Sequence, residues 1–237
     1  MFKITSGTVM DLAQLERDRF YRDMVALVRE LSPQQAALIG ADTEIKAAIS
    51  SSMDRAIALG GAQRDTLQLF VELSLQMGIG FTDDPLLGLE EVIPKVQGVS
   101  EVYWREQLFQ RAVLLMDRIA APDWAPFDAA LARFQAMPPD AQTDPFRAVR
   151  SLYPQKADDV SDAMLQNVRA RLDEVAVAHH APEARDMLFY LGVVFGHRCY
   201  EDPYLPWIGE ALRADDAGGA LRDGLSTWSR AYLTIAP

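Results

Sequence analysis

The stretch LFVELSLQMGIGFTDDPLLGL, residues 69–89, is matched 118 positions later by MLFYLGVVFGHRCYEDPYLPW, residues 187–207. An ungapped alignment pairs Leu73 with Leu191, Gly78 with Gly196, Asp84 with Asp202, Pro85 with Pro203, and Leu87 with Leu205. A match of this length indicates that one supersecondary unit is used twice. We therefore expect an internal duplication, in which two similar helical subdomains are related by a pseudo-twofold axis.

Apolar residues recur at helical spacing along the chain, and no segment alternates with period two long enough to predict a strand. The sequence therefore predicts an all-α protein. The expected helices cover residues 9–31, a short segment ending near 40, then 43–59, 63–80, 100–120, 127–136, 145–152, 157–179, a central helix starting at 182, 204–213 and 219–234. We divide the chain into a first half (1–121), a Pro-rich connecting strap with its own helix (122–145), and a second half (146–237).

Asp84 and Asp202 each precede a proline, Pro85 or Pro203. An aspartate is a favourable N-cap, and proline is tolerated at the first helical position because its missing N–H would have no partner there. The residue before a proline also avoids the α-helical region, which ends the preceding segment. We therefore predict that each Asp-Pro pair starts a short helix and has a structural role.

Gly78 and Gly196 occupy the same position in the two stretches. Gly78-Ile79-Gly80 resembles the start of a dinucleotide-binding loop, but no predicted strand precedes it and no third glycine follows. A missing side chain also lets a second helix approach closely. We interpret both glycines as structural residues at such a contact.

The chain of 237 residues carries a net charge of −11, with 12 basic and 17 acidic residues in 1–121 and 11 and 17 in 122–237. This even acidity disfavours nucleic acid and anionic membranes as partners, and it favours a protein with a basic face. Cys199 is the single cysteine, so no disulfide is expected and a reducing, cytoplasmic location fits. The longest apolar runs are too short to cross a bilayer.

We find no nucleophile motif, and three histidines leave little choice of catalytic base. The chain also lacks His-Glu-x-x-His, Cys-x-x-Cys and the Glu-x-x-His pairs of di-iron bundles. The sequence therefore predicts a non-enzymatic protein without cofactor or metal. One alternative stays open, a metal-dependent helical enzyme that uses His197 and Glu201 at i, i+4, together with His179 or His180.

Four residues near the Asp-Pro turns are candidates for contact with a partner: Asp83, Glu201, Tyr204 and Trp207. Tyrosine and tryptophan often anchor interfaces, although both residues also fit a core, and the two acids also suit a helix N-terminus. A further alternative is a structural homodimer that pairs an apolar stripe on the last helix, namely Leu221, Leu225, Trp228 and Tyr232.

The segment VFGHRCYEDPYLPW, residues 194–207, resembles the V-F-G-x-x-F-x-x-D-P-x-L-P-W pattern of an uncharacterised all-helical bacterial family. Cys199 stands where an aromatic residue is usual, and residues 77–89 match the pattern less fully. Members of that family resemble accessory proteins encoded beside type VI secretion spike and toxin genes. The resemblance implies an immunity or adaptor role toward a toxin, and it supplies no catalytic residue.

Overall fold

The computed structural model describes residues 6–94, 99–121, 124–136, 144–158 and 160–234, and no strand occurs among them. The prediction of an all-α protein is therefore confirmed. The first half contains α1 (Ser6–Leu31), α2 (Pro33–Ile39), α3 (Asp42–Ala58), α4 (Arg64–Met77), the 3₁₀ turn η1 (Leu89–Glu91) and α5 (Glu101–Ile119). The remainder contains α6 (Ala125–Gln135), α7 (Pro145–Leu152), α8 (Pro154–Ala157), α9 (Asp162–Ala178), η2 (Pro182–Ala184), α10 (Arg185–Phe195), η3 (Cys199–Glu201), α11 (Pro206–Ala211) and α12 (Ala217–Thr234).

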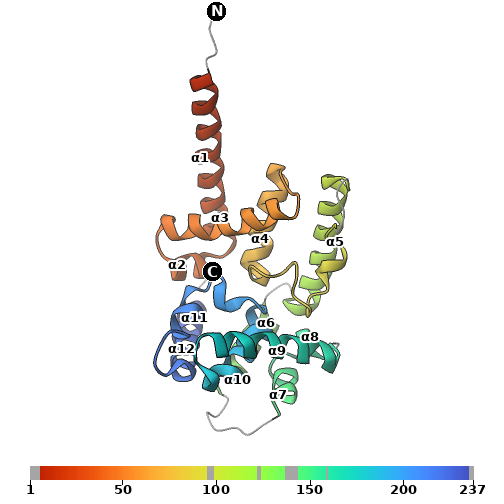
Figure 1. The fold of residues 1–237 in the computed structure, drawn as a ribbon, viewed down its shortest axis with the longest axis vertical. Coiled ribbons are helices and arrows are strands. Elements are labelled where there is room, and N and C mark those ends of the chain that lie inside the picture. Colours follow the sequence, from red (N-terminus) through yellow and green to blue (C-terminus); the bar gives the residue numbers. More distant parts are fainter. Residues whose placement is uncertain (1–5, 95–98, 122–123, 137–143, 159, 235–237) are drawn as a thin grey trace, which may run out of the picture.

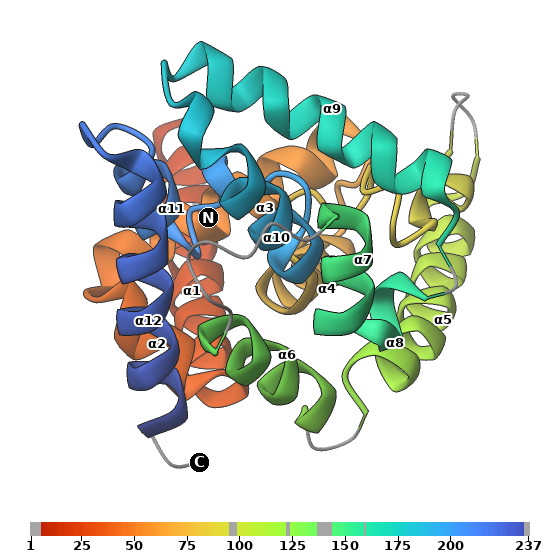
Figure 2. The same ribbon diagram turned by 90° about the horizontal axis from the view of Figure 1, so that it is seen from below.

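The two parts of the chain occupy different ends of the molecule (Figure 1). Helix α1 extends away from the body, and α5 lies at the opposite edge of the same end. Figure 2 shows α10 in the middle of the other end, with α9, α12, α6 and α7 around it. Residues 187–195 of α10 are all buried, because this helix is apolar on every side.

The turns that join α3 to α4 and α9 to α10 have the same geometry. The N–H of Gly61 donates to the carbonyl of Ala56 at 2.8 Å, and the N–H of Ala181 donates to that of Ala176 at 2.8 Å. The residue before each donor has positive φ, 89° at Gly60 and 58° at His180. Both helices thus end in a left-handed residue, although only the first turn uses glycine for it.

Several predicted boundaries are wrong, and the side chains at the turns give the reason. Helix α4 ends at Met77 and not at residue 80, because Gly78 has φ 87° and leaves the helical region. No α-helix begins at Pro85, where turns lead to η1, and α11 begins at Pro206 and not at residue 204. Both aspartates close a local turn with their side chains in place of starting a helix.

The helix predicted over 157–179 is present as α9, but its predicted start is wrong, since α8 ends at Ala157 and α9 begins at Asp162. Ser161 is the N-cap of α9, and its side chain accepts a hydrogen bond from the N–H of Met164. The predicted start at Pro182 falls on the short η2 turn that leads into α10. The parts of the strap at residues 122–123 and 137–143 lie outside the described residues.

The described residues form three buried apolar clusters, two mainly in the first half and one mainly in the second. Helix α6 of the strap contributes Phe127, Leu131 and Phe134 to the cluster of the second half. Two buried residues each pack in an apolar cluster of the other half. Leu86 of the first half packs in the second-half cluster, and Tyr204 of the second half packs in a first-half cluster. The two Asp-Pro turns therefore join the halves through their cores.

Candidate functional site

The two buried aspartates that the sequence singled out hold the Asp-Pro turns against each other. The Oδ1 atom of Asp84 accepts the N–H two residues later at 2.9 Å, and Asp202 makes the same bond at 2.9 Å. Each Oδ2 atom accepts the N–H that follows the opposite glycine: His197 donates to Asp84 at 3.2 Å, and Ile79 donates to Asp202 at 2.9 Å. The contacts between the two turns are therefore reciprocal.

Gly78 and Gly196 lie where these turns cross, each at the end of its helix and not in the helix interior as predicted. A Cβ on Gly78 would stand 2.3 Å from the carbonyl oxygen of Phe195, and one on Gly196 would stand 3.1 Å from that of Met77. Both glycines also have positive φ, which side chains disfavour. Close approach of the two backbones thus depends on glycine at both positions.

The surroundings of Asp84 stabilise its negative charge. Burial alone raises the pKa of Asp84, but His197, Lys156 and a backbone N–H outweigh burial and hold this pKa below its ordinary value. The Nδ1 atom of His197 lies 3.8 Å from Asp84 Oδ2, and its Nε2 atom lies 3.7 Å from Asp83 Oδ2. Burial lowers the pKa of His197, and the two aspartates outweigh it and raise the pKa overall.

Asp202 makes the equivalent hydrogen bonds, but its surroundings disfavour its negative charge. Burial raises its pKa to about 7, and the N–H groups of Ile79 and Tyr204 only partly oppose this effect. Ile79 stands where the other turn has His197, so no imidazole faces Asp202 from that position. The two halves of the junction therefore differ in charge although their backbone hydrogen bonds agree.

Asp83 and Glu201, both candidates for partner contact, lie in one ion-pair network at the edge of the junction. Arg55 Nη2 is 2.7 Å from Asp83 Oδ1, and Arg198 Nη1 is 3.4 Å from Asp83 Oδ2. Arg198 also pairs with Glu201. Burial raises the pKa of Asp83, but His197 and the two arginines outweigh it and lower this pKa overall. Both acids thus have basic neighbours within the chain.

The two aromatic candidates lie in different environments. Tyr204 is 1% exposed, and its hydroxyl lies 3.2 Å from Ser52 Oγ, so it is a core residue that no partner can reach in this structure. Trp207 is half-buried against Gly224, where a Cβ would stand 2.5 Å from its ring. The apolar stripe of α12 is likewise turned inward, since Leu221, Leu225 and Trp228 are buried.

The residues of the metal alternative are not gathered around one point. His197 faces Asp83 and Asp84, whereas Glu201 faces Arg198. Among the described residues, no group of three or more histidine, cysteine or acidic side chains is placed to hold a metal ion. Cys199 is buried as a free thiol, and burial raises its pKa well above the ordinary value.

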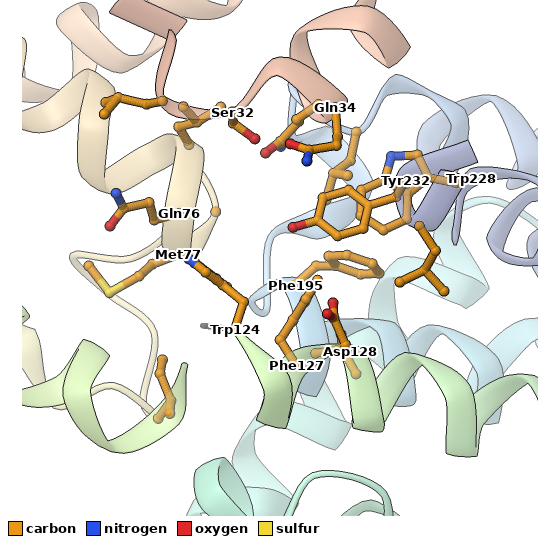
Figure 3. Close-up of a pocket in the computed structure, with 18 of the residues that line it drawn as sticks. Ser32, Gln34, Gln76, Met77, Trp124, Phe127, Asp128, Phe195, Trp228 and Tyr232 are labelled. Carbon is orange, nitrogen blue, oxygen red and sulfur yellow. The ribbon is translucent and has the colours of Figure 1, made fainter. Parts of the chain in front are cut away.

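A cavity of about 550 Å³ lies between the halves, and the sequence analysis did not predict it (Figure 3). Ser32 and Gln34 from the first half face a group of aromatic rings from the second. Lys156 of α8 also lines the cavity and is 3% exposed. The only sequence signal was one lysine in a short proline-started segment, and it did not identify a site.

The outward face of α5 is a second feature that sequence reasoning missed. Six of the twelve large apolar side chains exposed among the described residues lie on or just before this helix: Val99, Val102, Tyr103, Phe109, Val113 and Leu114. Their exposed fractions range from 39% to 66%. The buried stripe of α5, which contains Trp104, Leu108 and Leu115, lies on the opposite side. The sequence signal for this exposed face was the presence of apolar residues on both sides of one predicted helix.

Comparisons of the chain with family models, with curated proteins and with solved structures find no significant match. The function must therefore be argued from the residues of this chain. Within the described part of the chain, none of the helices is both long and apolar enough to cross a bilayer.

Proposed function

We propose that this protein is a non-enzymatic, cytoplasmic binding protein whose outward α5 face receives another protein. The observation that carries the proposal is the gathering of Val102, Tyr103, Phe109, Val113 and Leu114 on the exposed side of α5. Contiguous exposed apolar patches mark interaction sites, whereas single exposed apolar residues are ordinary. With Val99, immediately before the helix, these residues extend over more than three turns in two rows, and Glu106 and Asp117 are exposed between the rows.

The charges near this face favour a basic partner. Glu106 and Asp117 are exposed on the same side of α5 as the apolar residues. Two arginines of the helix already face acids of this chain, since Arg105 is 3.4 Å from Asp65 and Arg111 is 3.6 Å from Glu91. The whole chain carries a net charge of −11. A partner with an apolar ridge flanked by lysine or arginine would complement this face and associate faster at low salt.

The resemblance of residues 194–207 to the bacterial family pattern supports a narrower assignment. In this assignment the chain is an immunity or adaptor protein for a type VI secretion toxin. The repeated segments and the reciprocal bonds of Asp84 and Asp202 also support the proposal that the scaffold arose by duplication of one helical unit. In this assignment the duplicated junction holds the scaffold together, and α5 selects the partner.

The test uses the full-length chain and the purified product of the neighbouring toxin or spike gene. Titration calorimetry at low and at moderate salt measures Kd for the wild type and for Phe109→Glu and Leu114→Glu. A charge in an apolar interface without a partner costs at least about 1.4 kcal/mol, so we expect Kd to rise at least about tenfold. Higher salt should weaken binding of the wild type.

Val177→Glu is the matched control, because Val177 is 53% exposed on α9 and isolated from the α5 face. It should bind like the wild type. Failure of every neighbouring toxin or spike product to bind would overturn the proposed function, and equal effects of Phe109→Glu and Val177→Glu would overturn the assigned surface. Sedimentation should show a monomer; a dimer dispersed by Phe109→Glu would mean that α5 pairs with a second copy.

A further inference from the structure

The aromatic wall of the cavity between the halves forms a preformed apolar surface (Figure 3). The ring centroids of Phe127 and Phe195 are 5.9 Å apart, those of Phe195 and Trp228 are 5.2 Å apart, and Trp228 stacks on Tyr232 at 5.0 Å. Each ring is thus held by its neighbours. The volume of about 550 Å³ lies within the range of small-molecule sites.

Two residues that line this cavity carry buried hydrogen-bond donors with few acceptors. Trp228 is 6% exposed, and its Nε1 atom has no hydrogen-bond partner among the described residues. Lys156 is 3% exposed, and its Nζ atom makes one long bond, 3.4 Å, to the carbonyl of Val194. An ammonium group has three hydrogens to donate, and buried donors without acceptors cost about 1–3 kcal/mol each. An occupant that presents acceptor oxygens would remove this cost.

The remaining polar groups limit the charge of the occupant. Glu30 and Asp128 line the same cavity, so a ligand with two negative charges would be repelled. Ser32 and Gln34 add neutral polar groups on the wall that faces the rings of Tyr232 and Trp228. Exposed residues at the junction of α1 and α2 and at the end of α12, Leu31 and Leu233, also line the cavity, so it is accessible from solvent.

We propose that this cavity binds an aromatic monocarboxylate, with the ring against Phe195 and Trp228 and its oxygen atoms accepting from Lys156 and the Trp228 indole. This site is separate from the α5 face, and its existence does not depend on the protein partner. A free aromatic acid and the C-terminal aromatic residue of a polypeptide present the same chemistry.

Three probes test the proposal with the full-length protein at pH 7: 3-phenylpropionate, its uncharged amide, and the tripeptide Gly-Gly-Phe with a free carboxylate. Trp124 and Trp228 line the cavity, so intrinsic fluorescence reports occupancy, and calorimetry gives Kd. We expect at least one carboxylate to bind with Kd below about 1 mM and the amide to bind about tenfold more weakly. The preference between the acid and the tripeptide identifies the source of the ligand.

Trp228→Phe keeps an aromatic ring and removes the N–H, so the carboxylate should bind about fivefold more weakly. Lys156→Met should abolish the preference for acid over amide, and Lys46→Met, an exposed lysine of α3, is the matched control. If Lys156→Met does not fold, Trp228→Phe still tests the site. Equal binding of acid and amide to the wild type would overturn the proposal, as would no saturation by either carboxylate at about 10 mM.

Discussion

Asp84 and Asp202 offer a direct test of the junction, because they make equivalent hydrogen bonds in different electrostatic surroundings. We expect Asp84→Asn to destabilise the protein far more than Asp202→Asn at pH 8, and we expect the cost of Asp202→Asn to fall steeply as pH rises. In both variants one oxygen becomes an NH₂ group that faces a backbone N–H. Loss of that hydrogen bond costs about 1–2 kcal/mol in each case.

The additional cost at Asp84 comes from Lys156. This lysine is 3% exposed, and Asp84 is the acidic group that opposes the lowering of the Lys156 pKa by burial. Breaking a direct buried ion pair costs about 3–5 kcal/mol, which is an upper limit for the longer-range attraction between Asp84 and Lys156. Asp84→Asn should therefore reduce the free energy of unfolding by several kcal/mol at pH 8.

At Asp202 the ionised carboxylate reduces the stability of the folded protein, which is opposite to the effect at Asp84. Its pKa rises from 3.8 to about 7 in the folded protein, so the folded state binds a proton that the unfolded state has released between these values. This contribution to stability is complete below pH 3.8 and is lost as pH rises to about 7, a change of about 4 kcal/mol. Asp202→Asn has no ionisable carboxyl at this position, so the variant does not lose this stability as pH rises. Its cost should be about 1–2 kcal/mol below pH 3.8. It should be near zero at pH 5, where about 1.6 kcal/mol of the contribution is already lost, and it should reverse at pH 8.

Urea unfolding followed by circular dichroism between pH 5 and pH 8 measures both effects. His197, whose pKa is also raised, makes the wild type lose stability as pH rises above 6.5. Subtracting the wild-type curve removes this contribution for Asp202→Asn, which keeps both aspartates that raise the His197 pKa. Asp84→Asn removes one of them, so its cost also contains a His197 contribution that is larger at pH 5 than at pH 8. An Asp202→Asn cost that stays constant from pH 5 to pH 8 would refute the electrostatic reasoning, and so would equal costs for the two variants at pH 8.

Three further substitutions have defined outcomes in thermal or urea unfolding. Gly78→Ala should cost at least about 3 kcal/mol, because its Cβ would meet an opposing carbonyl at 2.3 Å and φ is 87°. Gly88→Ala is its control: φ is 63° but no atom lies within 4 Å, so only about 1 kcal/mol of backbone strain is expected. His180→Gly should stabilise the protein by about 0.5–1 kcal/mol, since φ is 58°. Tyr204→Phe should cost about 1 kcal/mol through the lost contact with Ser52, and an unchanged midpoint would show that this contact contributes nothing.

The sequence predicted the helices and the importance of the repeated residues, because helical periodicity and turn residues are local signals. It did not predict that Asp84 and Asp202 bond across the junction, since each acid makes one local bond and one bond over more than 110 positions. The short helix expected after Pro85 is absent because the aspartate side chain closes the turn itself. The cavity at Lys156 is lined by many segments that lie far apart in the sequence, and no local pattern encodes their meeting.

The unusual character of α5 becomes clear when it is aligned with α12 on buried positions. Trp104 then corresponds to Leu221, and Leu108 corresponds to Leu225, so both helices bury one stripe in the same register. The outward apolar residues of α5 at 102, 103, 109, 113 and 114 fall opposite Gly219, Ala220, Ser226, Arg230 and Ala231. These five residues of α12 are small or polar, and α6 packs beside this helix, with the Phe127 and Tyr232 ring centroids 6.0 Å apart. On α5 the outward residues are large, apolar and exposed, and burial of each would contribute about 1.5–3 kcal/mol. A helix or ridge of another protein that covers α5, as α6 covers part of α12, would bury them.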